Sequence, residues 1–207
     1  MINSKGKVII FTAPSGAGKT TVVQHLLKTY PELGFSISAT TRPKRKHEKT
    51  GVDYYFMEAE QFQKKIAANE FLEWEEVYPG KFYGTLKSEV QRIWAQNKHI
   101  IFDVDVKGAT SIKSYFKDEA LAVFIKPPSL NVLIDRLTNR GTENAEALKQ
   151  RIEHVKNELT YEDRFDKVLV NDILEVTLKE AEFIVEDFLK WNAKYGNDDY
   201  QWDSNFG

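Results

Sequence analysis

The chain contains 207 residues, of which 29% are charged and 42% are hydrophobic, and its net charge is −2 with an isoelectric point near 6.1. This is the composition of a globular protein, and it excludes intrinsic disorder and a strongly basic nucleic-acid-binding protein. Because the chain has no cysteine, it has no disulfides, thiolate metal sites or cysteine nucleophiles.

The predicted elements alternate between strands and helices. The expected strands are Val8–Thr12, Phe35–Ala39, Tyr54–Met57, Ile100–Val104, Leu121–Ile125 and Val168–Val170. The expected helices are Lys19–Thr29, Ala59–Asn69, Leu86–Asn97, Val106–Phe116, Leu130–Asn139, Ala145–Thr160 and Val176–Trp191. This alternation predicts an α/β fold with a mainly parallel sheet. The polar residues Tyr195–Gly207 are expected to form a frayed tail.

Location and partners follow from what the sequence lacks. No apolar run approaches the roughly 20 residues that a membrane helix needs, and residues 1–12 lack a signal-peptide pattern. We therefore expect a cytoplasmic protein whose partners include neither a membrane nor a nucleic acid. The sequence is compatible with a monomer and with a homo-oligomer.

A Gly-rich loop joins the first predicted strand to the first helix. It reads T-A-P-S-G-A-G-K-T-T over Thr12–Thr21 and meets the phosphate-loop consensus G-x-x-x-x-G-K-[ST] everywhere except at Ala13, which replaces the first Gly. Backbone amides in such a loop bind phosphate oxygens, and the helix N-terminus adds positive dipole. The alternative is a strand–helix turn that binds nothing. The candidate nucleotide-binding residues are Ala13, Pro14, Ser15, Gly16, Ala17, Gly18, Lys19, Thr20 and Thr21, with Lys19 on the β- and γ-phosphates and Thr20 on Mg²⁺.

A basic segment follows the second predicted strand. Ser38–Tyr55 reads S-A-T-T-R-P-K-R-K-H-E-K-T-G-V-D-Y-Y. The guanidinium groups of Arg42 and Arg45 can grip one phosphate together, Tyr54 can donate its hydroxyl to it, and Glu48 can orient the arginines. A solvated charge run or a nucleic-acid-binding patch is the alternative interpretation.

Carboxylates and arginines further along the chain suit phosphoryl transfer. Asp103 ends an apolar strand, at the edge where open α/β sheets bind ligands. Asp105 is either a second site carboxylate or a helix cap. The segment R-L-T-N-R-G-T-E over Arg136–Glu143, followed by Arg151, offers arginines that can stabilise the charge of a transferring phosphoryl group. The alternative is a helix–loop–helix with solvated arginines.

These motifs occur together and in order. The segments are A-P-S-G-A-G-K-T-T, S-A-T-T-R-P-K-R, G-V-D-Y-Y-F, N-E-F-L-E-W, Y-G-T, D-V-D-x-K-G, R-L-x-x-R-G-T-E and V-N-D. The chain resembles the guanylate kinase family from about Val8 to Leu189. The resemblance implies phosphorylation of GMP by ATP with Mg²⁺, in purine metabolism and GMP recycling, and we expect dGMP to be used as well.

The resemblance also implies an architecture. It consists of a three-layer phosphate-loop core (about residues 1–37, 88–137 and 149–191), an inserted GMP-binding lobe (about 38–87), a mobile lid (about 138–148) and a polar tail (about 192–207). Val170-Asn171-Asp172 implies a loop beside the adenine, or alternatively a turn that caps the last helix. The four histidines lack metal-ligand spacing and are expected to be non-catalytic.

Residue roles follow from the same resemblance. One ionised carboxylate can accept both the N1–H and the 2-amino group of guanine; Glu73 is implied in this role, although a solvated helix-end carboxylate is the alternative. The implied GMP-binding residues are Ser38, Arg42, Arg45, Glu48, Tyr54, Glu73, Tyr83, Thr85 and Asp103. The implied catalytic residues are Lys19, Arg45, Arg140 and Arg151; the implied metal ligands are Thr20 and Asp103; and the implied donor-site residues beyond the phosphate loop are Arg136, Asn171 and Asp172.

Three rival functions remain open. A kinase for dTMP or AMP is opposed by Glu73 and Ser38. A non-catalytic scaffold module usually follows other domains and has a degraded phosphate loop, whereas this chain has seven residues before its first predicted strand and retains Lys19 and Thr20. An RNA-binding protein is disfavoured by the net charge and by the lack of a stacking-aromatic motif.

Overall fold

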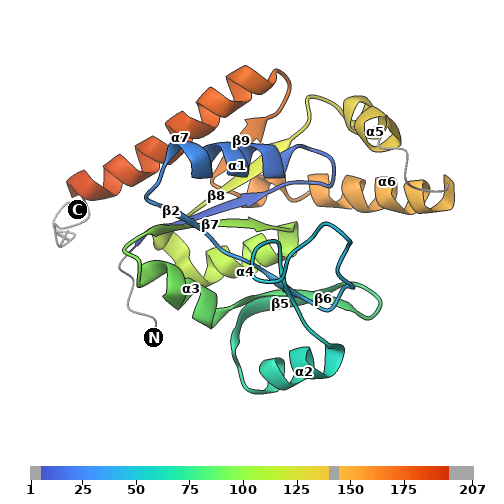
Figure 1. Cartoon of the computed structure of the whole chain (residues 1–207). Coiled ribbons are helices and arrows are strands. Elements are labelled where there is room, and N and C mark those ends of the chain that lie inside the picture. The colour runs from blue at the N-terminus through green and yellow to red at the C-terminus, as the bar shows by residue number, and fades with distance from the viewer. Residues whose placement is uncertain (1–5, 140–144, 196–207) are drawn as a thin grey trace, which may run out of the picture.

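The computed structural model describes residues 6–139 and 145–195, which form two β-sheets with helices packed around them (Figure 1). The strands are β1 (Val8–Thr12), β2 (Leu33–Phe35), β3 (Ala39–Thr40), β4 (Tyr55–Phe56), β5 (Phe71–Tyr78), β6 (Lys81–Leu86), β7 (His99–Val104), β8 (Ala120–Lys126) and β9 (Lys167–Val170). The helices are α1 (Lys19–Thr29), α2 (Ala59–Ala67), α3 (Lys87–Trp94), α4 (Val106–Phe116), α5 (Leu130–Asn139), α6 (Ala145–Leu159) and α7 (Leu174–Tyr195), with short 3₁₀ helices at Lys117–Glu119 and Glu162–Arg164.

The larger sheet is parallel and lies between two helical layers. Its strand order is β2-β7-β1-β8-β9. Alternate residues of β1 face opposite sides: Ile9 and Phe11 pack with α1 and α7, while Val8 and Ile10 pack with α3 and α4. Burial on both faces explains why β1 is a continuous apolar run. The predicted α/β fold with a mainly parallel sheet is confirmed.

The smaller sheet is mixed and has the order β4-β3-β6-β5. Its strands β3 and β4 are parallel, whereas β6 is antiparallel to both β3 and β5. Helix α2 covers it through Phe62, whose ring stacks on Phe71 with a centroid separation of 4.3 Å. Residues 39–86 supply every strand of this sheet.

The predicted strand Phe35–Ala39 is wrong as a single element. Strand β2 ends at Phe35 in the larger sheet, and β3 begins at Ala39 in the smaller one. The three residues between them cross from one sheet to the other: the amide of Ser36 still bonds the Ile101 carbonyl at 3.0 Å, but that of Ile37 donates to a side chain, Glu89. One apolar stretch therefore contributes strand residues to both sheets.

The β5–β6 hairpin was not predicted. Three glutamates within β5 lower its strand propensity, yet it pairs with β6 across a turn in which Gly80 has a φ of 73°. Leu86, expected to begin a helix, belongs to β6, and α3 ends at Trp94 rather than at Asn97.

Helix α7 is longer than predicted, because it begins at Leu174 and continues through residues 192–195 of the expected tail. The remainder of that tail and residues 140–144 of the expected lid lie outside the described residues. In the described ranges, every helix is too short or too polar to span a membrane.

Candidate active site

The phosphate loop connects β1 to α1 and has a left-handed backbone at two glycines. Gly16 and Gly18 have φ values of 91° and 94°. A Cβ on Gly18 would lie 2.2 Å from the side-chain nitrogen of Asn171, so this position needs glycine for both conformation and space. The loop amides therefore stand at the N-terminus of an 11-residue helix, a geometry that binds phosphate.

Ala13, which replaces the first consensus glycine, is accommodated without strain. It is buried in the core beside Val22 and Ile125, and it is not among the described residues with positive φ. The first loop position does not need glycine here.

Lys19 and Thr20 converge on Asp103 at the carboxyl end of β7. Lys19 Nζ lies 2.7 Å from Asp103 Oδ1 and donates to the Val104 carbonyl at 2.6 Å. Thr20 Oγ1 donates to Asp103 Oδ2 at 3.3 Å. Thr20 and Asp103 thus bring together two oxygen atoms of the type that Mg²⁺ prefers as ligands.

The cap interpretation of Asp105 is confirmed. Its Oδ1 accepts a hydrogen bond from the Gly108 amide at 2.7 Å and so caps helix α4. Asp105 also lines the cavities described next, so the two interpretations are compatible.

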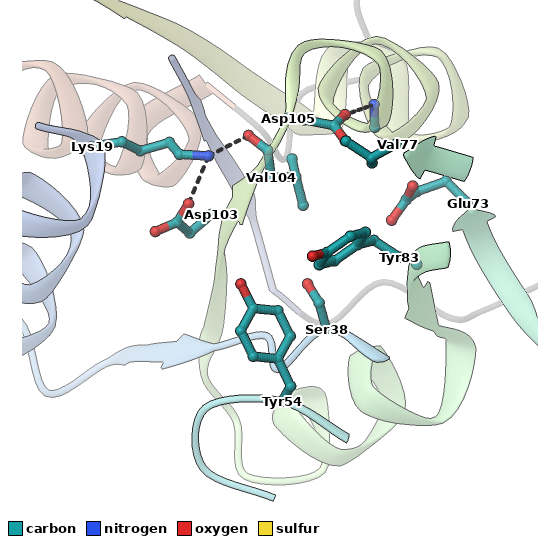
Figure 2. A pocket seen from close by; sticks show the side chains of 11 residues that line it. Lys19, Ser38, Tyr54, Glu73, Val77, Tyr83, Asp103, Val104 and Asp105 are labelled. Atoms are coloured by element: carbon teal, nitrogen blue, oxygen red, sulfur yellow. Dashed lines mark hydrogen bonds and ion pairs between the residues drawn. The ribbon is translucent and has the colours of Figure 1, made fainter. Parts of the chain in front are cut away.

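A cavity of about 220 Å³ lies between the two sheets (Figure 2). Glu73 and Lys19 lie on opposite sides of it, and the hydroxyls of Ser38, Tyr54 and Tyr83 line it between them. Burial raises the pKa of Tyr54, so this group remains a hydroxyl donor. The lining residues are Lys19, Ser38, Tyr54, Glu73, Val77, Tyr83, Gly84, Asp103, Val104, Asp105 and Gly108. The cavity brings together five of the residues expected to bind GMP, namely Ser38, Tyr54, Glu73, Tyr83 and Asp103.

Glu73 lies on β5, not at a helix end, and is opposite Thr85 of β6. Burial raises the pKa of Glu73 to about 7, and the nearby Asp105 carboxylate reinforces the shift. The buried Thr85 hydroxyl has no partner at hydrogen-bond geometry in the described structure. A ligand with adjacent donors would suit this half-buried carboxylate at the cavity wall.

Gly108 is a site residue that we did not single out from the sequence. A Cβ at this position would lie 3.1 Å from Glu73 Oε2, so glycine leaves room beside the carboxylate. Gly108 is the last residue of the D-V-D-x-K-G motif, and this glycine was the available signal for a site residue.

The basic segment is organised around a buried carboxylate. Glu48 accepts bonds from two Arg42 nitrogens, at 2.8 and 3.0 Å, and from the Arg45 amide at 2.7 Å. The Arg42 bonds lower the pKa of Glu48 to about 2. Arg42 also lies 5.3 Å from the Tyr54 ring centroid, whereas the Arg45 side chain is exposed. The basic segment thus forms a hydrogen-bonded loop in which the Arg42 guanidinium contacts Glu48 and the Tyr54 ring.

A second cavity of about 340 Å³ follows the phosphate loop. Besides Ala13, Pro14, Ser15, Gly16, Gly18, Lys19, Thr20 and Thr21, it is lined by Val77, Asp103, Asp105, His154 and Glu158. Four of these residues, Lys19, Val77, Asp103 and Asp105, also line the first cavity. The two cavities therefore meet at the Lys19–Asp103 pair.

Helix α6 contributes Arg151 to the second cavity region. The Arg151 guanidinium donates to Ser15 Oγ at 2.7 and 3.2 Å. His154 and Glu158, one and two turns further along, line the cavity, and we did not predict either of them as a site residue. Their spacing from Arg151 is that of one helix face, which was the available signal. Arg140 lies outside the described residues.

Asn171 supports the phosphate loop from β9. Its side-chain amide donates to the Ala17 carbonyl at 2.7 Å, and its own carbonyl accepts from Arg136 at 3.1 Å. Asp172 is exposed. The contacts with the donor nucleotide that were expected of Arg136, Asn171 and Asp172 stay predictions.

Comparisons with known proteins relate the chain to one family. The family model described as guanylate kinase matches residues 5–188. The guanylate kinase of Bacteroides fragilis is 47% identical over 185 residues, covering 89% of this chain and 91% of that protein. The guanylate kinase of Porphyromonas gingivalis is 50% identical over 184 residues, covering 88% and 98%. The crystal structure of guanylate kinase from Anaplasma phagocytophilum matches with a TM-score of 0.70 and 27% identity, covering 87% of this chain and 85% of that one.

Proposed function

The chain belongs to the guanylate kinase family, and from this premise we propose that its first cavity binds GMP and its second binds the phosphates of ATP. The main support for this assignment is that both cavities are lined by Lys19 and Asp103, while Glu73 lies on the opposite side of the first cavity. A base held at Glu73 directs its phosphate toward the donor.

Guanine recognition follows from the chemistry of the Glu73 carboxylate at the cavity wall. Ionised Glu73 accepts the N1–H and the 2-amino group together, whereas adenine has an acceptor at N1 and no 2-amino group. Because burial raises the pKa of Glu73 to about 7, its carboxyl is incompletely ionised near pH 7 before guanine binds. Guanine donors favour the ionised form and so strengthen their own binding.

The transfer step needs alignment and charge neutralisation. A GMP phosphate oxygen attacks the γ-phosphorus of ATP in line, and the bond to the β–γ bridging oxygen breaks. Lys19, Arg45, Arg140 and Arg151 offset the charge on the transferring group. The attacking phosphate is already deprotonated, so no histidine is needed as a base.

Magnesium fits the residues at the shared wall. Thr20 Oγ1 and Asp103 Oδ2, which lie 3.3 Å apart, would hold the ion together with phosphate oxygens. When bound, Mg²⁺ neutralises charge on the β- and γ-phosphates. Lys19 is bonded to Asp103 and would exchange this partner for a phosphate when the nucleotide binds.

We extend the proposal to dGMP, because none of the residues assigned to the acceptor site is an evident reader of a 2′-hydroxyl group. The corresponding role is the return of GMP to the GDP pool in the cytoplasm. A coupled assay with ATP and each of GMP, dGMP, AMP, dTMP and CMP tests acceptor choice. We expect turnover with the two guanine nucleotides only, and comparable turnover with AMP or dTMP would overturn the assignment of the first cavity.

Arg151→Ala should lower kcat far more than it raises the KM for GMP. Arg151 lies at Ser15 of the phosphate loop and is absent from the wall of the first cavity, so its effect belongs to transition-state charge. By analogy with other charge-stabilising groups we expect a loss of about 10²–10³-fold in kcat. Steady-state kinetics at saturating ATP measure both constants.

The matched control is Arg164→Ala, because Arg164 lies after α6, where it stacks on Tyr161, and outside all the cavities described. Its kinetics should equal those of the parent. If Arg151→Ala instead raised the KM for GMP and left kcat intact, Arg151 would belong to the acceptor site.

A further inference from the structure

The chain crosses between the two sheets twice, and one buried carboxylate lies where the crossings meet. The first crossing runs from the end of β2 at Phe35 to the start of β3 at Ala39, and the second leads from β6 directly into α3. Glu89 is in the first turn of α3, and its side chain is only 2% exposed. It does not line either cavity of the active site.

The Glu89 carboxylate joins both parts of the molecule. Its Oε1 accepts the amide hydrogen of Ile37, in the first crossing, at 3.0 Å. Its Oε2 accepts the hydroxyl hydrogen of Tyr55, on β4 of the smaller sheet, at 3.0 Å. Helix α3 itself packs on the larger sheet through Val90 and Ile93.

Arg92 completes the arrangement from the next turn of the same helix. Its guanidinium donates to Glu89 Oε2 at 3.0 Å and Oε1 at 2.5 Å, and to the Phe35 carbonyl at 3.2 Å. These bonds lower the pKa of Glu89 against the effect of its burial. The carboxylate is therefore ionised and has partners on both oxygens, which fixes its position.

Glu89 bonds Ile37, which leads into the smaller sheet, and Tyr55, which belongs to that sheet. Both are sequence neighbours of residues assigned to the acceptor site. Ile37 precedes Ser38 and Tyr55 follows Tyr54, and the side chains of Ser38 and Tyr54 both line the first cavity. The Tyr55 amide also bonds the Ser38 carbonyl at 2.9 Å. A shift of Ile37 or Tyr55 would move the cavity wall.

We propose that Glu89 is a positioning residue for the acceptor nucleotide, which acts through Ile37 and Tyr55 to hold Ser38 and Tyr54 at their places in the cavity wall. The inference rests on the proposed GMP site. Its consequence is expected on the acceptor side, because the bonds of Glu89 go to Ile37, Tyr55 and Arg92, none of which belongs to the phosphate loop.

Two substitutions test the role. Glu89→Gln keeps the side-chain size but presents an amide donor to the donors of Arg92 or Ile37, and Tyr55→Phe removes one bond while keeping the ring. We expect the KM and the calorimetric Kd for GMP to rise about 10- to 100-fold in Glu89→Gln and about 3- to 10-fold in Tyr55→Phe. The KM for ATP should stay within about twofold of the parent. The exposed Glu60→Gln is the matched control.

The outcomes separate positioning from a general structural role. A purely structural defect would lower the melting temperature and the active fraction, and hence kcat, while leaving the KM for GMP unchanged. The double variant should show less than the product of the two single effects on KM, because both act through one contact. If both single variants bind GMP within about twofold of the parent, the proposal is overturned; Tyr55→Phe still decides it if Glu89→Gln does not fold.

Failure of this inference can be told from failure of the GMP site itself. Glu73→Gln, measured alongside, changes a residue inside the cavity. If it weakens GMP and the Glu89 and Tyr55 variants do not, only the positioning role is wrong. If none of the three affects GMP, the acceptor site has been assigned to the wrong cavity.

Discussion

Glu73→Gln should lower kcat/KM for GMP by about 10²–10⁴-fold, as expected when the polar groups of a binding site are mismatched with their substrate. The substitution replaces one acceptor oxygen by an NH₂ donor, which must then face a donor of guanine. Each bond to an ionised partner contributes about 1.5–3 kcal/mol, and an unpaired buried group costs a similar amount. The side chain keeps its size, so the packing against Gly108 is retained.

Steady-state kinetics with GMP and ATP measure this loss, and ATP affinity should change little because Glu73 is absent from the phosphate-loop cavity. Glu70→Gln is a matched control in the same N-E-F-L-E-W motif, since Glu70 is exposed and paired with Lys65 at the surface. Use of GMP by Glu73→Gln within about threefold of the parent, a change well under 1 kcal/mol, would mean that another group reads the base.

Lys19→Ala should lower kcat by about 10²–10³-fold, the loss typical when a preorganised charge-stabilising donor is removed. Lys19 stands on the wall that both cavities share, where the transferred group must pass. In the described structure its partners, Asp103 and the Val104 carbonyl, lie at the end of β7, so β1 and α1 keep their packing when the side chain is truncated.

Single-turnover measurements on protein with an unchanged circular dichroism spectrum isolate this chemical effect. Lys28→Ala, an exposed position in the last turn of the same helix, should behave as the parent. Near-normal turnover by folded Lys19→Ala would exclude this loop as the ATP phosphate site.

The sequence predicted best those elements whose pattern depends on local burial. Strand β1 and helices α1, α4 and α5 begin and end where expected. Strand β1 is apolar throughout because the sheet is covered on both faces, so its pattern needs no knowledge of its neighbours. The phosphate loop was predictable for a related reason, since its chemistry is carried by consecutive residues.

The elements that failed depend on tertiary partners. Strand β5 contains glutamates, which are unfavourable in strands, and their partners lie far away in the sequence. Glu73 lines the first cavity, and Glu75 forms an ion pair with Lys107 of α4. The Phe35–Ala39 stretch divides because Glu89, 52 residues from Ile37, bonds the Ile37 amide. No local pattern indicates such a partner.

The candidate site divides in the same way. Motif resemblance identified Glu73, Tyr54 and Asp103, which the fold brings to one cavity. It did not indicate that Asn171 supports the phosphate loop or that Glu158 faces that loop from α6. These are relations between residues, and they appear only when the chain is folded.

The central claim is that Glu73 reads guanine through two adjacent donors, and one comparison tests it most directly. Inosine monophosphate keeps N1–H but lacks the 2-amino group, so kcat/KM for GMP and for inosine monophosphate should be measured on the parent and on Glu73→Gln. We expect the parent to prefer GMP by at least about tenfold, the value of one hydrogen bond to an ionised partner, and the preference to shrink toward unity in the variant. Equal use of the two nucleotides by the parent, or an undiminished preference in Glu73→Gln, would contradict the account.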